Sequence, residues 1–122
     1  MQMALYKAVR KAPERNSMRH CILVKYNETV DQAAKEKLLP EIQKVFAPLT
    51  EIDGIESVRL FPCTVDRDNR YDLLIRIEMD PAALPAYDDS EPHRIWKRDY
   101  ARYLEKKAIF DYEEPAADPI KN

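Results

Sequence analysis

The chain has 122 residues, of which 45% are hydrophobic and 34% are charged, and its 20 basic and 22 acidic side chains give a net charge of −2. This length suits one domain, because two independent cores would each bury too little surface. The balanced charge excludes a broad electrostatic attraction to nucleic acid or to an anionic membrane, and the apolar stretches are too short to span a bilayer. We therefore expect a single cytoplasmic domain that binds neither nucleic acid nor membrane.

The chain has one glycine, Gly54, and two cysteines, Cys21 and Cys63. A loop that cradles phosphates needs several glycines, so nucleotide sites of the usual glycine-rich kinds are excluded. Two cysteines form neither a disulfide framework nor a four-ligand zinc site, and the two histidines lack a tight metal-binding spacing. We expect no metal and no cofactor, and we expect both cysteines to be reduced and buried in the core.

Residues 1–17 differ in composition from the rest of the chain. They carry four basic side chains against one acidic side chain, and Pro13 interrupts the only helical pattern. We interpret them as an N-terminal arm and residues 114–122 as a C-terminal tail, with one domain over 18–113 between them. A nucleic-acid contact or a transit-like role of the arm is the minor alternative.

Alternating side chains predict the first strand over 20–26. His20, Ile22, Val24 and Tyr26 share one face, and most residues of the other face are apolar as well. Because apolar residues on both faces are typical of a covered strand, we expect a central position in the sheet.

A helix is predicted to follow, capped by Thr29 or Asp31. Pro40 lies inside it, where a proline removes a backbone hydrogen bond and clashes with the preceding turn. We therefore expect a bend at Pro40 or two helical pieces. The buried face consists of apolar residues at spacings of three and four, namely Ala34, Leu38, Ile42, Val45 and Leu49.

Two strands are predicted next, over 55–61 and 71–79. The first ends at Pro62, and a polar connection leads to the second. In the second strand the odd-numbered residues from 73 to 79 are all apolar, whereas the even-numbered ones are mixed. This alternation predicts one buried face and one partly exposed face.

The last third of the chain predicts two helical segments and a final strand. A capping aspartate followed by Pro81 is a strong helix start, and this segment reaches Tyr87. After an acidic interruption, a second helical segment is predicted from His93 to Leu104. A short strand over 108–112 completes the pattern.

This order of elements, β-α-β-β-α-β, predicts an α+β domain of the ferredoxin-like plan. In that plan two helices cover one face of a four-stranded antiparallel sheet, and the other face is bare. We expect Leu23, Leu74 and Ile109, or their partners, on the bare face. Because exposed apolar area is unfavourable, two copies are expected to pair these faces in an isologous homodimer.

His93 gives the strongest indication of chemistry. It follows Ser90-Glu91-Pro92 in the first turn of a helix, where backbone N–H groups disfavour an imidazolium and the acidic neighbours favour it. A neutral imidazole is a potential general base, and the Tyr87 hydroxyl is a potential partner that polarises a carbonyl or holds a phenolate. The alternative, favoured by local spacing alone, is that His93 caps its helix or contacts a carboxylate without any substrate.

The other polar and aromatic residues have structural interpretations. His20 is expected to be a buried histidine bonded to the backbone or to solvent near the edge of the sheet. Trp96 and the tyrosines after it are more typical of core and interface than of an aromatic pocket. The basic residues of the last helix are offset by acidic ones, which predicts a solvated helix face.

Parts of the sequence resemble the stress-responsive dimeric α/β-barrel (Dabb) family. The resemblance covers about residues 18–113 and implies a homodimer in which two ferredoxin-like sheets form a dimeric α/β barrel. It implies less about function, because many members have no assigned activity. The stretches that carry the resemblance are 18–26, 71–73 and 87–112, with 104–112 the most similar.

One member of that family, a plant polyketide cyclase, closes a linear poly-β-keto thioester by aldol condensation without a cofactor. The resemblance implies that His93 is the base, that Asp111 holds its tautomer and that Tyr87 steadies the substrate. The residues then expected to bind the substrate are His20, Ile22, Val24 and Trp96.

The leading hypothesis is a homodimer that binds a small apolar or aromatic carbonyl compound and acts as a cofactor-free cyclase, isomerase or lyase. It rests on the joint presence of His20, Tyr87, His93 and Asp111. The rival hypothesis is a stress-protective or structural assembly in which these residues only pack. A haem-dependent or cofactor-free oxygenase on a related barrel is a third class with less support.

Overall fold

The computed structural model of the chain describes residues 17–113 and residue 120. The predicted arm and tail therefore lie outside the described residues, except for Ser17 and Ile120. Ser17 is buried beside the sheet, and its hydroxyl donates to Glu78 Oε2 at 3.2 Å. No helix within 17–113 is long and apolar enough to cross a membrane.

Four strands form one antiparallel sheet in the order β2-β3-β1-β4. With one helical segment inserted between β1 and β2 and another between β3 and β4, this is the ferredoxin-like arrangement, and the predicted fold class is confirmed. The predicted central position of the first strand is also correct, because β1 pairs with both β3 and β4. The strands are β1 (Met18–Tyr26), β2 (Ile55–Pro62), β3 (Leu73–Met79) and β4 (Leu104–Glu113).

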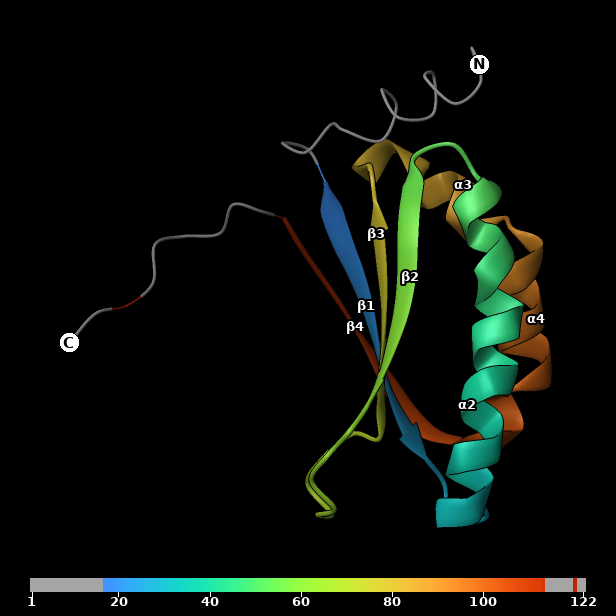
Figure 1. Cartoon of the computed structure of the whole chain (residues 1–122), viewed down its shortest axis with the longest axis vertical. Helices are drawn as coiled ribbons and strands as arrows, with labels where there is room; N and C mark the ends of the chain where they lie inside the picture. Colours follow the sequence, from blue (N-terminus) through green and yellow to red (C-terminus); the bar gives the residue numbers. More distant parts are fainter. Residues whose placement is uncertain (1–16, 114–119, 121–122) are drawn as a thin grey trace.

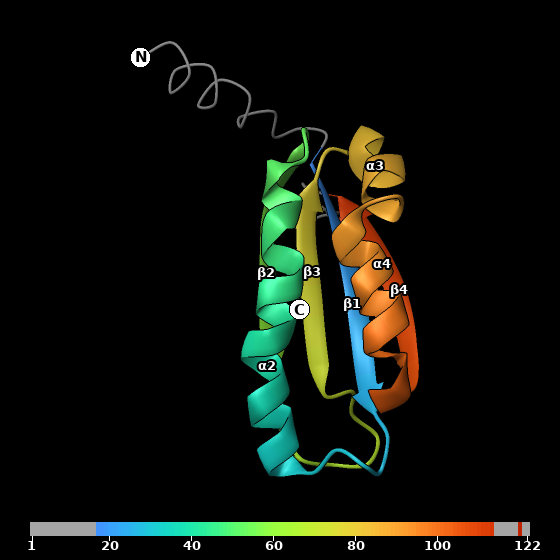
Figure 2. The same cartoon turned by 90° about the vertical axis from the view of Figure 1, so that its right-hand side faces the viewer.

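The helices lie on one face of the sheet, and no described element covers the other face (Figure 1). The long helix α2 (Gln32–Phe46) lies over β2 and β3, and α4 (Glu91–Asp99) lies over β1 and β4 (Figure 2). The short helix α3 (Leu84–Asp88) precedes α4 at one end of this layer. Single 3-10 turns flank the helices at 47–51, 81–83 and 101–103.

Helix α2 shows how packing overrides a local breaker. Asp31 caps it by accepting the Ala34 N–H at 2.9 Å, which is one of the two predicted caps. Of the two predicted alternatives, a bend at Pro40 or two helical pieces, the second is wrong, because α2 continues through Pro40. Leu38, Ile42 and Phe46 are buried on both sides of the proline, and this continuous apolar stripe offsets the lost hydrogen bond.

The core fills the space between the sheet and the helices. Alternate residues of β1 and β3 point into it, as the sequence pattern predicts. Fully buried members include Ile22, Val24, Ile75, Ile77, Met79, Ile42, Phe46 and Trp96.

The C-terminal third departs from prediction. The chain leaves α4 at Asp99 and enters β4 at Leu104, whereas the pattern predicts a helix to 104 and a strand from 108. Pairing with β1 overrides the helix-like spacing here, and charged side chains are typical of an edge strand. Ile109 is also misassigned: it pairs with Ile22 and so shares the helix-covered side, while Ala108 and Phe110 occupy the open face.

The two cysteines differ in burial, and both are free thiols. Cys21 is buried on the open side of β1, as its strand pattern allows. Cys63 is exposed, so its predicted burial in the core is wrong. The reason is that β2 ends at Pro62, which leaves Cys63 in the connection to β3.

Candidate functional site

The register of β1 and β4 brings the first pair of site residues together. His20 of β1 lies directly opposite Asp111 of β4, and His20 Nδ1 is 2.6 Å from Asp111 Oδ1. Because an ionised carboxylate only accepts, Nδ1 carries a proton in this contact, and in the neutral imidazole Nε2 then has the lone pair. The His20 side chain is 9% exposed, whereas that of Asp111 is 41% exposed, so the dyad runs from the core to the surface.

Tyr87 lies between the two histidines of the chain. It is held by α3 at the end of the sheet where β1 begins, and it is 1% exposed. The centroid of its ring is 5.2 Å from that of His20 and 4.7 Å from that of His93. The fold thus joins Asp111, His20, Tyr87 and His93 in one continuous cluster.

The hydroxyl of Tyr87 is suited to donate a hydrogen bond. Burial raises its pKa, and the charges of Asp88 and Asp111 raise this pKa further. The phenol therefore stays protonated at neutral pH, which supports the polarisation of a carbonyl and not the phenolate alternative. Among the residues that the structure describes, none forms a hydrogen bond with this hydroxyl.

The corner between α3 and α4 fixes His93 relative to Tyr87. Ser90 caps α4: its hydroxyl donates to the Tyr87 carbonyl at 2.7 Å and accepts the His93 N–H at 3.3 Å. His93 Nδ1 is 2.9 Å from the Asp88 carbonyl oxygen. Because a carbonyl only accepts, this nitrogen donates, and in the neutral imidazole Nε2 of His93 then has the lone pair. Ser90 is a positioning residue that sequence reasoning missed, although a serine three residues before an N-terminal-turn histidine is a recognisable capping pattern.

The implied role of Asp111 needs correction. The resemblance to the Dabb family places Asp111 behind His93, but its carboxylate contacts His20. The physical reason is the strand register, which sets Asp111 and His20 opposite each other on the same face. His93 is held by a backbone carbonyl instead.

The other three predicted site residues lie in the core. Ile22 and Val24 share the His20 face of β1 and are 2% and 0% exposed. Trp96 lies one turn after His93 on α4 and packs between Phe46 and Tyr100, with ring centroids 5.5 and 5.7 Å away. All three side chains are at most 2% exposed, so they belong to the core and have no opening to solvent.

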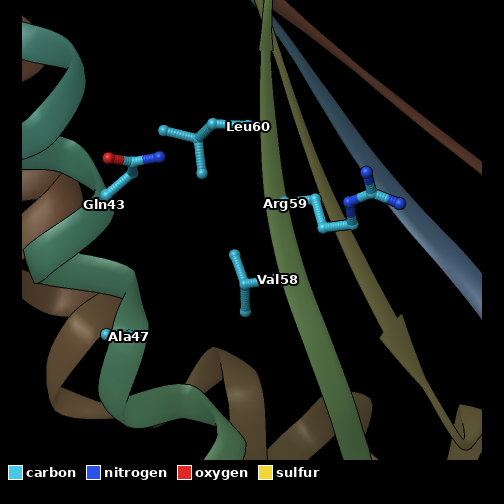
Figure 3. Close-up of a pocket in the computed structure, with 5 residues that line it drawn as sticks. All are labelled: Gln43, Ala47, Val58, Arg59 and Leu60. Carbon is cyan, nitrogen blue, oxygen red and sulfur yellow. The ribbon is translucent and has the colours of Figure 1, made fainter.

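Two pockets lie away from this cluster. One, of about 360 Å³, lies between α2 and β2, where Gln43 and Ala47 face Val58 and Leu60 (Figure 3). Arg59, which is drawn in the same view, points to the opposite side of the sheet. The other, of about 380 Å³, lies where α2 begins and β2 ends. Within 17–113, no group of three or more histidine, cysteine or acidic side chains is arranged to hold a metal ion.

Comparison with known proteins finds relatives by structure and not by sequence. Neither a family model nor a curated protein matches the chain. A dimeric ferredoxin-like protein of unknown function from Thermobifida fusca aligns with a TM-score of 0.69 and 18% identity, over 85% of this chain and 97% of that one. A hydroxynitrile lyase from Passiflora edulis aligns with a TM-score of 0.65 and 15% identity, over 86% and 99%.

A third solved structure bears on the predicted resemblance. It is a Dabb family protein with a ferredoxin-like fold from Mesorhizobium loti, with a TM-score of 0.62 and 20% identity over 86% of this chain and 98% of that one. Sequence identities at this level show that the folds are alike and do not show a shared function. The chain therefore has the ferredoxin-like fold of a Dabb family protein, which confirms the predicted resemblance at the level of the fold.

Proposed function

We propose that this chain acts as a homodimer and binds a small apolar or aromatic carbonyl compound at the cluster of His20, Tyr87, His93 and Asp111. In this proposal the cluster performs cofactor-independent acid–base chemistry of a cyclase, isomerase or lyase. The observation that carries it is the Tyr87 hydroxyl, which is buried between two imidazoles and has no hydrogen-bond partner within 17–113. A relative in fold is described as a hydroxynitrile lyase, so this scaffold is compatible with a lyase.

We propose that the reaction begins when a proton leaves the carbon next to a carbonyl, as it does in an aldol-type cyclisation or a keto–enol isomerisation. In our proposal His93 Nε2 takes this proton, and the electron pair of the C–H bond moves toward the carbonyl oxygen. The Tyr87 hydroxyl donates a hydrogen bond to the enolate oxygen that forms. His20, held by Asp111, packs on the other side of Tyr87 and orients its ring. The proton returns from His93 to carbon or oxygen in the second step, so the chemistry is balanced without a further reactant.

The first step can be measured directly as exchange of the α-hydrogens of acetophenone in D2O, followed by proton NMR. We expect the protein to accelerate exchange, His93→Ala to slow it by about 10²–10⁴-fold, and Tyr87→Phe by about 10²–10³-fold. Tyr103→Phe removes a hydroxyl outside the cluster and should leave the rate unchanged. Exchange no faster than in buffer, or insensitive to both cluster variants, would refute the enzymatic proposal.

The homodimer is proposed from the open face of the sheet. Its centre is apolar: Phe110 is 61% exposed, and Leu23 and Leu74 are half-buried beside it. Of the charged groups around this centre, Arg19 pairs with Glu78 at 2.9 Å, and Arg59 and Arg76 both lie over the ring of Phe61. Such a face is suited to burial against a second copy, and fold relatives are described as dimeric.

The dimer proposal predicts unequal effects at two neighbouring residues. Phe110→Lys puts a charge on the open face and should weaken self-association at least about thirtyfold, measured by sedimentation equilibrium. Ile109→Lys is the matched control, because Ile109 is 50% exposed on the other side of the same strand. A wild-type chain that stays monomeric at high concentration would refute the dimer.

The alternative function is a stress-protective or structural assembly without catalysis. The closure of the cluster favours it, because Tyr87 is 1% exposed and neither described pocket includes a cluster residue. In this case the cluster only packs, and the acetophenone experiment gives the buffer rate for every variant.

A further inference from the structure

A second site is indicated at the opposite end of the layer between sheet and helices. The pocket of about 380 Å³ lies where α2 begins and where the connection from β2 to β3 starts, at the lower end of the molecule in Figures 1 and 2. Its volume is within the range of about 300–1,000 Å³ that is typical of small-molecule sites. None of its lining residues belongs to the cluster of His20, Tyr87, His93 and Asp111.

Asp72 makes one wall of this pocket rigid. Its carboxylate accepts the Tyr26 N–H at 2.8 Å through Oδ2 and contacts Lys35 Nζ at 3.1 Å through Oδ1. Its backbone N–H donates to the Val24 carbonyl at 2.8 Å, and its carbonyl accepts the Cys63 N–H at 2.9 Å. Asp72 therefore joins β1, α2 and the end of β2, so the pocket is held by fixed elements and not only by an exposed loop.

Tyr26 supplies an unused donor in this wall. It is the last residue of β1, it lines the pocket, and it is 7% exposed. No residue in the described part of the chain forms a hydrogen bond with its hydroxyl. Burial raises the pKa of this phenol to about 12, and the charge of Asp72 adds to the effect, so it remains a donor at neutral pH. A buried donor without a partner is expected to bind an acceptor from water or from a ligand.

Charge and apolar surface narrow the class of ligand. Lys35, already paired with Asp72, is the single basic residue among the described lining residues, while Glu36 and Asp66 are exposed at the rim. This excess of carboxylates disfavours an anionic ligand. Leu39, Val65 and Leu73 add apolar lining.

We propose that this pocket binds a neutral small molecule that joins an apolar body to a carbonyl group, with the carbonyl oxygen accepting a hydrogen bond from the Tyr26 hydroxyl. Amide or hydroxyl hydrogens on the ligand would face the carboxylates of Glu36 and Asp66. The site is independent of the proposed chemistry at Tyr87, because the two tyrosines lie at opposite ends of the helix–sheet layer.

The test is a titration of the full-length, nitrogen-15-labelled chain with benzamide, followed by amide NMR. Millimolar benzamide should shift the amides of Tyr26, Cys63 and Leu73. Benzoate, which has the same shape and a negative charge, should bind more weakly. Tyr26→Phe should weaken benzamide binding about fivefold to tenfold, and Tyr87→Phe should leave it unchanged.

Cys63 supplies a second measurement that needs no variant. It is an exposed thiol in the lining, whereas Cys21 is buried, so benzamide should slow the alkylation of Cys63 by iodoacetamide. Unshifted pocket amides together with unprotected Cys63, equal binding of benzoate, or full affinity in a folded Tyr26→Phe variant would each overturn the proposal. The acetophenone assay depends on His93 and Tyr87, whereas benzamide binding depends on Tyr26. A negative result in one experiment therefore does not affect the interpretation of the other.

Discussion

Tyr87 and Tyr26 lie at opposite ends of the layer between the sheet and the helices, and each lies close to an aspartate and a basic side chain. At one end Asp111 binds His20, and Tyr87 packs against this imidazole and against His93 with 1% of its surface exposed. At the other end Asp72 binds Lys35 and the backbone of Tyr26, and the tyrosine lines a pocket. Similar groups thus form a closed aromatic cluster in one place and an open, mixed pocket in the other.

The difference follows from what surrounds each tyrosine. At the closed end the capped corner at Ser90 folds α4 back over Tyr87, and two rings cover the phenol. At the open end the connection after β2 leaves the sheet at Pro62, and no aromatic ring within residues 17–113 stacks on Tyr26. Residue types alone therefore do not show where a ligand has access. Access depends on which element of the fold covers these residues.

The largest expected effect concerns alkaline stability at the open end. The unfolded chain loses the Tyr26 proton near pH 10, whereas the folded chain keeps it until about pH 12. The contribution of Tyr26 to the free energy of unfolding is therefore fully present below pH 10 and is lost as the pH rises to about 12. In this window the phenol is deprotonated only in the unfolded state, which is thereby stabilised. Between these pH values the wild-type chain should lose about 2–3 kcal/mol more free energy of unfolding than Tyr26→Phe. Urea unfolding of both proteins across this pH range measures the difference.

The control for this measurement is Tyr112→Phe. Tyr26 pairs with Leu104 at the start of β4, and Tyr112 lies near the other end of this strand. The variant leaves Tyr26 in place, so it should lose as much stability at high pH as the wild type. An identical alkaline decline in wild type and Tyr26→Phe would contradict the raised pKa of the Tyr26 phenol.

The sequence predicts the fold better than it predicts the two sites. Burial of one face makes apolar residues recur at every second position in a strand and at every third or fourth position in a helix. For this reason the strands around Ile22 and Ile75 and the buried helix face with Leu38 and Ile42 could be predicted. The register of β1 and β4 depends on the whole sheet, and without it Ile109 is assigned to the wrong face. The family resemblance pairs Asp111 with His93, whereas this register places it opposite His20.

The open pocket illustrates what sequence reasoning misses. Asp72 is far in sequence from Tyr26 and Lys35, the three match no motif, and only the fold brings Asp72 to the other two. His93 and Tyr87, in contrast, lie on either side of one helix corner, so their proximity could be predicted from local sequence. Local sequence thus indicates the closed cluster, while the pocket is visible only in three dimensions.

The smallest expected effect compares the two hydroxyls at neutral pH. A buried hydroxyl without a partner costs free energy, so Tyr87→Phe should raise the free energy of unfolding by about 1 kcal/mol. Tyr26→Phe should change it by less than about 0.5 kcal/mol, because the pocket gives its hydroxyl access to water. Urea unfolding of both variants beside wild type measures the difference.

The sign of the Tyr87→Phe effect decides between the two functions proposed for the closed cluster. If Tyr87 is retained for catalysis at a cost in stability, its replacement by phenylalanine is expected to stabilise the protein. A loss of stability would instead mean that the hydroxyl satisfies a partner in the folded assembly, and Tyr87 would then be a packing residue. That result would favour the structural alternative and would leave the open end, with Tyr26 and its pocket, as the part of the molecule best suited to bind a ligand.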